Sequence, residues 1–358
     1  MRSPANVAEV LPVSKFDVTI VSCIAVRIPN ESNIILDTGE HSLASLKRHL
    51  SPSEYHEFFS KLRLIYISHP HADHHLGLIS IVKQYIQIQN TFPQSQRMPL
   101  FLIAPHRLFS SLYEYNQVED LGIEGYVVPF ASNTLIPRLL ADAYEPPDLG
   151  LFQGFLSHMN LRSVETCFVP HCSQAYGVAI THKSGWKIVY SGDCRPSGDL
   201  VEIGQDATVL IHEATLAESQ RPEAVDKMHS TTGEAITIGN RMRAKHILLT
   251  HFSQKWHTVP KFVLEWSEHK NEKEKYGNVG IAFDRMRVKI GEMWKLPLLY
   301  PAFAAMYGSP KTKRYVTHTK RVNQMDGGNG DETEEEEPIA KRRRMQESEQ
   351  KEAIAIGK

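Results

Sequence analysis

The sequence of 358 residues predicts a mixed α/β fold built in layers, and three observations support this fold class. Short apolar runs that are typical of strands alternate with segments of helical period up to residue 309. Some strands follow each other directly as hairpins and others are separated by helices, which indicates mixed sheets. Several strands also end in His or Asp, so polar side chains gather at one edge of the sheets.

Composition limits the class of protein. The sequence is 41% hydrophobic and 23% charged, as in soluble globular proteins, and its net charge of −1 does not indicate a nucleic-acid binder. Any polyanion would have to bind a local patch. The four cysteines have no CxxC spacing, and neither a membrane-spanning run nor a secretory signal is visible. We therefore expect an intracellular protein with reduced thiols and no membrane association.

The first half of the chain predicts the following elements. Residues 1–15 read as a lead-in without regular structure, and strands at 16–27 and 33–36 are joined by a turn at Pro29-Asn30-Glu31. One or two short helices occupy 41–62, with Ser51 as the cap and Pro52 at the first helical position. The remaining elements are strands at 62–67, 98–104 and 125–129 and helices at 76–86 and 105–115.

A loop-rich insertion is expected at 131–163, because Pro137, Pro146-Pro147 and Gly150 interrupt its periodicity. Residues 177–183 and 186–190 read as a hairpin that turns at Ser184-Gly185. The other elements beyond the insertion are strands at 165–169, 207–211, 246–250 and 279–284, a helix at 231–243 and an irregular helix at 296–308.

The domain organisation follows from these elements. We assign residues 16–309 to one catalytic domain and residues 310–358 to a disordered tail, since the tail is polar and block-charged. Within the tail, Lys341-Arg342-Arg343-Arg344 reads either as a nuclear import signal or as a solvated basic run.

Residues 68–77 carry the most informative motif, with four imidazoles and a carboxylate on a turn between a strand and a helix. His69 and His71 are two residues apart, so in an extended turn both rings can reach one ion. Asp73 and His74 open the next helix and face a neighbouring position. Nitrogen and oxygen ligands at this spacing suit Zn²⁺, although Mn²⁺ or Fe would fit such a site as well.

Later strands end in further ligand types, notably His171, Asp193 and His251. Together with the turn they complete two sets of ligands, with a carboxylate available to bridge two ions. Two ions about 3.5–4 Å apart activate a water molecule and stabilise the attacking and leaving oxygens of a phosphodiester. The sequence therefore predicts a two-metal hydrolytic centre.

The spacing His69-x-His71-x-Asp73-His74 resembles the signature of the metallo-β-lactamase superfamily. This resemblance implies an αββα sandwich of two mixed sheets with outer helices. Over residues 20 to 305 the chain is similar to the tRNase Z family, and closest to the C-terminal, catalytic half of its long eukaryotic form. The motifs that carry this similarity lie at residues 190–196, 212–215 (His-Glu-Ala-Thr), 229–233 (His-Ser-Thr-Thr-Gly), 249–254 and 282–286.

The resemblance assigns roles to the metal ligands. It implies one zinc held by His69, His71 and His171, a second zinc held by Asp73, His74 and His251, and Asp193 as the bridge between them. Asp37 would support the ligands from behind.

It also implies the catalytic groups. Asp73 would orient or deprotonate the attacking water, and Glu213 would orient His229. His229 would then protonate the leaving 3′-oxygen of the tRNA, since a carboxylate partner keeps an imidazole charged near neutral pH. The implied function is a zinc-dependent endoribonuclease that removes 3′ trailers from precursor tRNA, with precursor tRNA as the partner. Apart from the resemblance, we expect a homodimer and, from the basic run at 341–344, a nuclear location; a mitochondrial or cytoplasmic location stays open.

Two departures from the family pattern leave alternatives open. The opening strand and Gly-Thr-Gly-Ser-type loop of the family have no visible counterpart, and His41 stands where the family expects Gly. The half of the long form that grips tRNA is absent, and residues 131–163 carry only Arg138 and Arg162 as basic groups. The alternatives are a metallo-hydrolase of a small ester or thioester, and a truncated, inactive relative that binds zinc or RNA.

Overall fold

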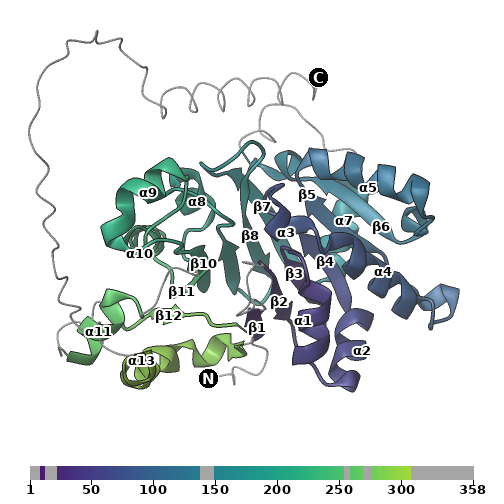
Figure 1. Ribbon diagram of the computed structural model, residues 1–358. Helices are drawn as coiled ribbons and strands as arrows, with labels where there is room; N and C mark the ends of the chain where they lie inside the picture. Colours follow the sequence, from purple (N-terminus) through teal and green to yellow (C-terminus); the bar gives the residue numbers. More distant parts are fainter. Residues whose placement is uncertain are drawn as a thin grey trace, which may run out of the picture.

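Two mixed β-sheets lie face to face in the computed structural model, with helices on their outer surfaces (Figure 1). The structure describes residues 9–12, 22–137, 149–253, 259–268, 276–284 and 286–307. The predicted class, an α/β sandwich of two mixed sheets with outer helices, is confirmed.

The first sheet has seven strands in the order β13-β1-β2-β3-β4-β5-β6. Neighbours from β13 to β3 pair antiparallel and those from β3 to β6 pair parallel. Its strands are β1 Glu9–Pro12, β2 Ile24–Arg27, β3 Asn33–Leu36, β4 Leu62–Tyr66, β5 Leu100–Ala104, β6 Val127–Ala131 and β13 Val288–Lys289.

The second sheet has six strands in the order β12-β11-β10-β9-β8-β7. The strands from β9 to β12 pair parallel, whereas β7, β8 and β9 form an antiparallel meander. Its strands are β7 Leu161–Phe168, β8 Tyr176–His182, β9 Lys187–Tyr190, β10 Val209–Glu213, β11 His246–Thr250 and β12 Val279–Ile281.

Helices bury apolar faces against the outer side of each sheet. Those on the first sheet are α1 Ser42–His49, α2 Pro52–Ser60, α4 Leu78–Gln89 and α5 His106–Val118. Those on the second sheet are α8 Gly198–Ile203, α10 Thr232–Arg241, α11 Lys261–Glu268 and α13 Tyr300–Tyr307. The short helices α3 Ala72–His75 and α9 Arg221–Asp226 and the 3₁₀ segment Ile290–Leu299 complete the arrangement.

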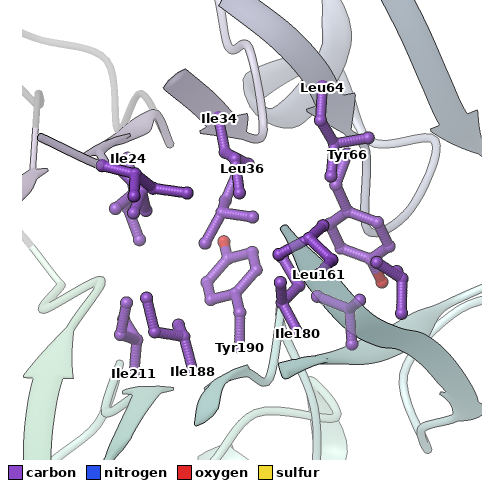
Figure 2. Packing of buried hydrophobic residues seen from close by; sticks show 14 of the residues in the cluster. Ile24, Ile34, Leu36, Leu64, Tyr66, Leu161, Ile180, Ile188, Tyr190 and Ile211 are labelled. Carbon is purple, nitrogen blue, oxygen red and sulfur yellow. The ribbon is translucent and has the colours of Figure 1, made fainter. Parts of the chain in front are cut away.

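The inner core lies between the two sheets (Figure 2). Leu36 and Leu64 of the first sheet face Ile188 and Ile211 of the second, and all four are at most 1% exposed. Across this core the rings of Tyr66 and Tyr190 meet edge to face at 6.5 Å. This apolar packing fixes the two sheets against each other, and therefore fixes the loops that leave the carboxyl ends of their strands.

Two sequence-based expectations were wrong. The predicted lead-in contains β1, which pairs with β2 and with β13, so a strand does precede β2. Four residues are too few to show periodicity, and one of the two strands that pair with β1 lies at residues 288 and 289, near the other end of the described chain.

The predicted loop-rich insertion contains α7, Leu149–His158, and the first residues of β7. Phe152, Phe155, Leu156 and Met159 recur at helical spacing and are buried in the inner core. The prolines that masked this period fall before the helix, and residues 138–148 lie outside the described part.

The other predicted elements are present, most of them with shifted ends. β3 and β11 have the predicted bounds, and the hairpin β8–β9 forms. Of the predicted strand at 16–27, residues 16–21 lie outside the described part and Ile24–Arg27 is a strand. The predicted tail and its basic run lie outside the described residues. Among the described residues, no helix combines the length and apolar character needed to cross a membrane.

Candidate metal centre

The loops that follow β3, β4, β7, β9, β10 and β11 converge at one edge of the sandwich. In the turn after β4, His71 has extended backbone and precedes α3. Close backbone approach holds this turn: a Cβ on Gly77 would lie 2.3 Å from the carbonyl oxygen of Gly39. The structure brings all ten predicted site residues into this region: Asp37, His69, His71, Asp73, His74, His171, Asp193, Glu213, His229 and His251.

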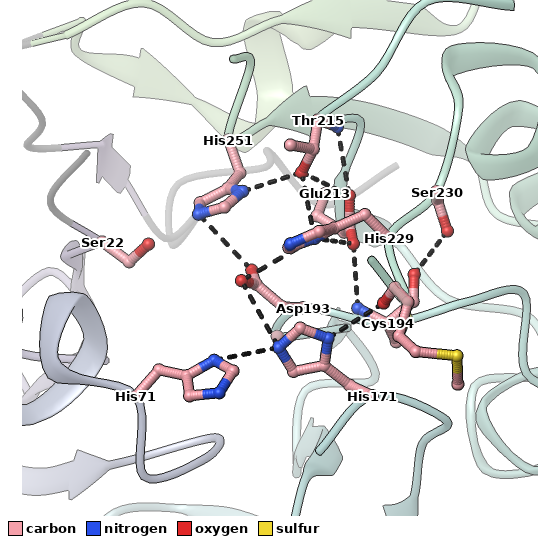
Figure 3. Close-up of polar contacts among 12 residues, drawn as sticks. Ser22, His71, His171, Asp193, Cys194, Glu213, Thr215, His229, Ser230 and His251 are labelled. Carbon is pink, nitrogen blue, oxygen red and sulfur yellow. Dashed lines mark hydrogen bonds and ion pairs between the residues drawn. The ribbon is translucent and has the colours of Figure 1, made fainter. Parts of the chain in front are cut away.

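One group of potential ligands consists of His69, His71 and His171. Nδ1 of His71 lies 3.0 Å from Nε2 of His69 and 3.1 Å from Nε2 of His171, so three nitrogens converge on one point. Figure 3 shows His171 between His71 and Asp193. Burial lowers the pKa of all three imidazoles, which keeps them in the neutral form that binds a cation.

A second group consists of Asp73, His74 and His251. Oδ2 of Asp73 lies 3.6 Å from Nε2 of His74 and 3.9 Å from Nε2 of His251. Burial by itself raises the pKa of Asp73, but the neighbouring His251 and His74 outweigh it and the net pKa is lowered. Asp73 is therefore an ionised acceptor, and its side chain is 34% exposed, so solvent can reach it.

Asp193 lies between the two groups. Its carboxylate is 3.2 Å from Nε2 of His74, 3.6 Å from that of His251, and 3.9 Å from those of His69 and His171. Burial alone would raise the pKa of Asp193, but the charges of His251 and His74 hold it well below its ordinary value. A carboxylate in this position can touch two cations at once.

These residues fit a metal. Nε2 of His251 is buried and has no hydrogen-bond partner among the described residues, although it faces Asp193 and Asp73. A buried nitrogen lone pair of this kind is normally satisfied, and a cation would satisfy it. The nitrogen and oxygen donors within each group lie within 4.8 Å of one another, as a shared ion requires.

Asp37 is fully buried and supports the cluster through hydrogen bonds. Its Oδ2 accepts hydrogen bonds from Nδ1 of His74 (2.7 Å), from Ser68 Oγ (2.8 Å) and from the Tyr190 hydroxyl (2.7 Å). Because the Nδ1 proton is held there, Nε2 of His74 turns toward Asp193. Burial lowers the pKa of His74, but Asp193 and Asp37 outweigh it and the net pKa lies well above the ordinary value.

The other ring nitrogens are also held. His171 Nδ1 donates to the Met228 carbonyl (2.9 Å), and Nδ1 of His251 meets Thr215 Oγ1 at 2.8 Å. Such partners fix both the tautomer and the orientation of a ligand ring.

Glu213 and His229 form a pair at the rim of the cluster. Nδ1 of His229 lies 2.9 Å from Oε1 of Glu213 and 3.9 Å from Oδ2 of Asp193. Glu213 is 1% exposed and also accepts from the Cys194 amide and the Thr215 hydroxyl. Burial lowers the pKa of His229, but the hydrogen bond and charge of Glu213 outweigh it, so its pKa is raised. The pair therefore favours a protonated imidazole, and Nε2 is the nitrogen left to donate.

A comparison with protein families decides the membership of this chain. The profile described as "Beta-lactamase superfamily domain" matches residues 32–252. The chain belongs to this superfamily. The centre described above lies almost entirely within the matched region, so superfamily membership agrees with the fold and with the position of the ligands.

Within the superfamily, the chain is similar to proteins named for RNA and phosphodiester hydrolysis. It is 38% identical to human "Zinc phosphodiesterase ELAC protein 2" and 34% identical to "Ribonuclease Z, mitochondrial" of Drosophila melanogaster; each alignment covers 80% of this chain, and 33% and 35% of those proteins. A long-form RNase Z from yeast has a TM-score of 0.72 at 26% identity, covering 83% of this chain and 43% of that one. The chain therefore spans about a third of the length of the curated relatives, and the predicted resemblance to tRNase Z is confirmed.

Several residues of this superfamily site were not predicted to have a role. Ser68 and Thr215 hydrogen-bond to the rings of His69 and His251, and the Tyr190 hydroxyl donates to Asp37. All three stand next to or within the recognised motifs, Ser68 beside His69, Tyr190 at the start of 190–196 and Thr215 at the end of 212–215, which was the available signal. Ser22 Oγ lies 3.4 Å from Nε2 of His74, and the sequence around Ser22 gave no indication of this contact.

Proposed function

We propose that this protein is a zinc-dependent phosphodiesterase that removes 3′ trailers from precursor tRNA. The observation that carries the proposal is the Glu213–His229 pair, held at 2.9 Å beside the metal centre. A ribose 3′-oxygen is a poor leaving group and needs a proton, whereas hydrolysis of a thioester does not require such a donor. The names of the relatives support the same reaction class.

The proposed ligands divide into two sets with a shared carboxylate. His69, His71 and His171 would hold one zinc, Asp73, His74 and His251 would hold the other, and Asp193 would be shared between them. When bound, zinc supplies Lewis-acid activation of water and charge stabilisation on the phosphoryl oxygens. Two ions per chain are expected, which elemental analysis of the purified protein measures; one ion per chain would contradict this stoichiometry.

The side chains of the protein perform the other steps of the proposed reaction. Asp73, the more exposed of the two central carboxylates, accepts a hydrogen bond from the attacking water and orients it toward phosphorus. The water oxygen forms a bond to phosphorus and one of its protons passes to Asp73, while the bond from phosphorus to the ribose 3′-oxygen breaks. Nε2 of His229 gives its proton to that oxygen, and Glu213 stabilises the charged ring. The products are a tRNA with a free 3′-hydroxyl and a trailer with a 5′-phosphate.

The decisive experiment incubates the purified protein with a 3′-extended tRNA transcript, with and without a chelator, and maps the cut. We expect a chelator-sensitive cut near the discriminator nucleotide that returns when zinc is restored. His229→Ala should lower the rate by about 10²–10⁴-fold, the usual contribution of a general acid.

Other outcomes identify the alternatives. Hydrolysis of a small ester or thioester that is indifferent to His229→Ala, without any cut in the transcript, would mean a small-molecule metallo-hydrolase. Tight binding of the transcript without turnover would mean an inactive relative.

Location and assembly are also proposals. We propose a nuclear location on the basic run at 341–344, to be tested by imaging a fluorescent fusion with and without that run. We propose a homodimer, to be tested by light scattering; a monomeric mass would contradict it.

A further inference from the structure

Arg195 lies two residues after the central carboxylate Asp193, and its side chain is 16% exposed. Its Nη1 donates to the backbone carbonyl of His229 at 2.6 Å and to Oε2 of Glu234 at 2.7 Å. Its Nη2 donates to Oε1 of Glu234 at 2.5 Å, which completes a bidentate pair. The guanidinium therefore joins the segment that carries His229 to the start of α10.

Glu234 is a fixed anchor for this contact. It belongs to the capping box of α10, in which its Oε2 accepts from the Thr231 amide at 3.0 Å while Thr231 Oγ1 accepts from the Glu234 amide. Arg221 approaches the same carboxylate at 3.4 Å, but its side chain is 67% exposed. Of these two arginines, Arg195 is the one that hydrogen-bonds to His229 within the described residues.

The backbone of Arg195 is tied to the centre as well. Its amide donates to the carbonyl of Pro170, the residue before His171, at 2.8 Å. Next to it, the carbonyl of Cys194 accepts from Ser230 Oγ at 2.6 Å. Residues 194 and 195 thus hydrogen-bond to Ser230, next to His229, and to Pro170, next to His171, so the backbone that carries the Arg195 guanidinium is itself held in place.

We propose that Arg195 is a positioning residue for proton donation by His229. Glu213 holds the ring through Nδ1, but the place from which the ring projects is set by its backbone, whose carbonyl Arg195 holds. Met228, just before His229, has a left-handed φ of 58°, a conformation that a non-glycine residue keeps only when its surroundings impose it. This inference rests on the proposed function, and it adds a residue that touches neither substrate nor metal.

The test compares substrates that differ in their need for a proton. Arg195→Ala and the matched control Arg221→Ala are assayed on 3′-extended tRNA and on bis(p-nitrophenyl) phosphate, whose leaving group departs without protonation. For Arg195→Ala we expect kcat on tRNA to fall by about 10²-fold, as misplacing a catalytic group by about 1 Å does, with little change in KM. On the nitrophenyl ester the loss should stay under about threefold, since the general-acid contribution is not needed there.

Arg221→Ala should keep both activities within about twofold, as expected for an exposed ion pair. Arg195→Lys keeps the charge but loses the two-pronged geometry of the guanidinium. Its kcat on tRNA should lie between those of the parent and of Arg195→Ala, while its kcat on the nitrophenyl ester should match that of the parent. Zinc content and the unfolding midpoint are measured for every variant, to show that each is folded and loaded.

Equal losses of Arg195→Ala on both substrates, or no loss on either, would overturn the proposal. If Arg195→Ala does not fold, Arg195→Lys takes its place, because it keeps the charge and loses the two-pronged geometry that reaches the His229 carbonyl; the same selective loss on tRNA, smaller in size, is then expected. If the parent cuts no tRNA, the proposed function fails. The positioning role is then judged on aryl phosphodiesters of rising leaving-group pKa, on which Arg195→Ala should lose more rate the poorer the leaving group; a parallel dependence for parent and variant would overturn it.

Discussion

Asp37 shows how a single buried carboxylate can set the geometry of a ligand. Its two oxygens accept four hydrogen bonds, from the Ser68 amide and hydroxyl, the Tyr190 hydroxyl and His74 Nδ1. The residue has a left-handed φ of 58°, which Asp and Asn tolerate better than most residues. Its role is therefore testable by Asp37→Asn, which keeps both shape and backbone preference.

We expect Asp37→Asn to weaken zinc binding by about 10- to 100-fold, the usual effect of losing a group that orients a metal ligand. An amide nitrogen is a donor, and at either oxygen position of Asp37 it would face another donor. A competition titration against a chelator measures the affinity.

Tyr190→Phe is the control for this variant, because it removes only one of the bonds to Asp37. It should lower the free energy of unfolding by about 1 kcal/mol and leave zinc affinity nearly unchanged. An equal loss of zinc affinity in both variants would contradict the role of Asp37 as the partner of His74.

At the scale of single elements, α2 offers a pH-dependent contribution to stability. The Ser51 amide donates to Oε2 of Glu54 at 3.0 Å, and Arg287 donates to Oε1 at 2.9 Å. The Ser51 backbone hydrogen bond, followed by Arg287, lowers the pKa of Glu54 from 4.5 to about 2. Because the folded pKa is depressed, the ionised carboxylate stabilises the protein above pH 4.5, and this contribution is lost as the pH falls toward 2.

Glu54→Gln should therefore be less stable than the parent at pH 6, by about 0.5 kcal/mol after allowance for solvent screening. Gln at this position is long enough to form the same capping box. The difference in free energy of unfolding between the two proteins should therefore narrow as the pH is lowered to 3.5. Urea unfolding of both proteins at each pH measures this difference, and the contributions of titratable groups that both proteins share cancel. A difference that is constant with pH would contradict the assignment to the Glu54 charge.

α7 contributes to the inner core through one aromatic face. Phe155 is 2% exposed, and its ring centroid lies 4.1 Å from that of Phe101 in β5. Phe155→Ala should lower the free energy of unfolding by about 3–5 kcal/mol, the cost of an aromatic cavity. Leu151, on the same helix but 42% exposed, is the control, and Leu151→Ala should change stability by less than about 0.5 kcal/mol. Similar losses in both variants would mean that α7 does not dock as described.

These elements also show what the sequence could and could not predict. The start of α2 was predictable because Ser51, Pro52 and Glu54 form a local signal that needs no partner. β3 was predictable because its apolar residues are contiguous. β1 was not, since a four-residue strand is stabilised by β2 and β13 rather than by its own pattern. α7 was missed because nearby prolines obscured a helical period that its buried face confirms.

At the scale of the whole molecule, the convergence of the candidate metal ligands was predictable because they follow strands whose carboxyl ends meet at one edge. The backbone that aims them was not: Asp37 and His251 have φ values of 58° and 59°, which no residue pattern encodes. The contact of Arg195 with His229 depends on a separation of 34 residues and on the docking of α10. Such contacts arise only once the tertiary fold is formed, so sequence patterns supply the ligand types while the fold supplies their orientation.

Because the candidate ligands come from both sheets, a metal bound by them would cross-link the two sheets. His69, His71, Asp73 and His74 belong to the turn after β4 in the first sheet, whereas His171, Asp193 and His251 follow strands of the second. A cation bound by both groups would bind the folded protein and not the unfolded chain. At a free zinc concentration 100 times the dissociation constant, such binding adds about 2.7 kcal/mol to the free energy of unfolding.

We therefore expect a chelator to lower the unfolding midpoint of the parent protein, and calorimetry with and without chelator measures the shift. In His251→Ala, which removes one ligand supplied by the second sheet, the chelator-induced shift should shrink. Arg243→Ala is the control: it breaks an exposed ion pair with Asp206, 2.8 Å long and outside the cluster, so its chelator-induced shift should match that of the parent. A shift of the same size in His251→Ala and in the parent would mean that zinc does not join the two sheets through this residue.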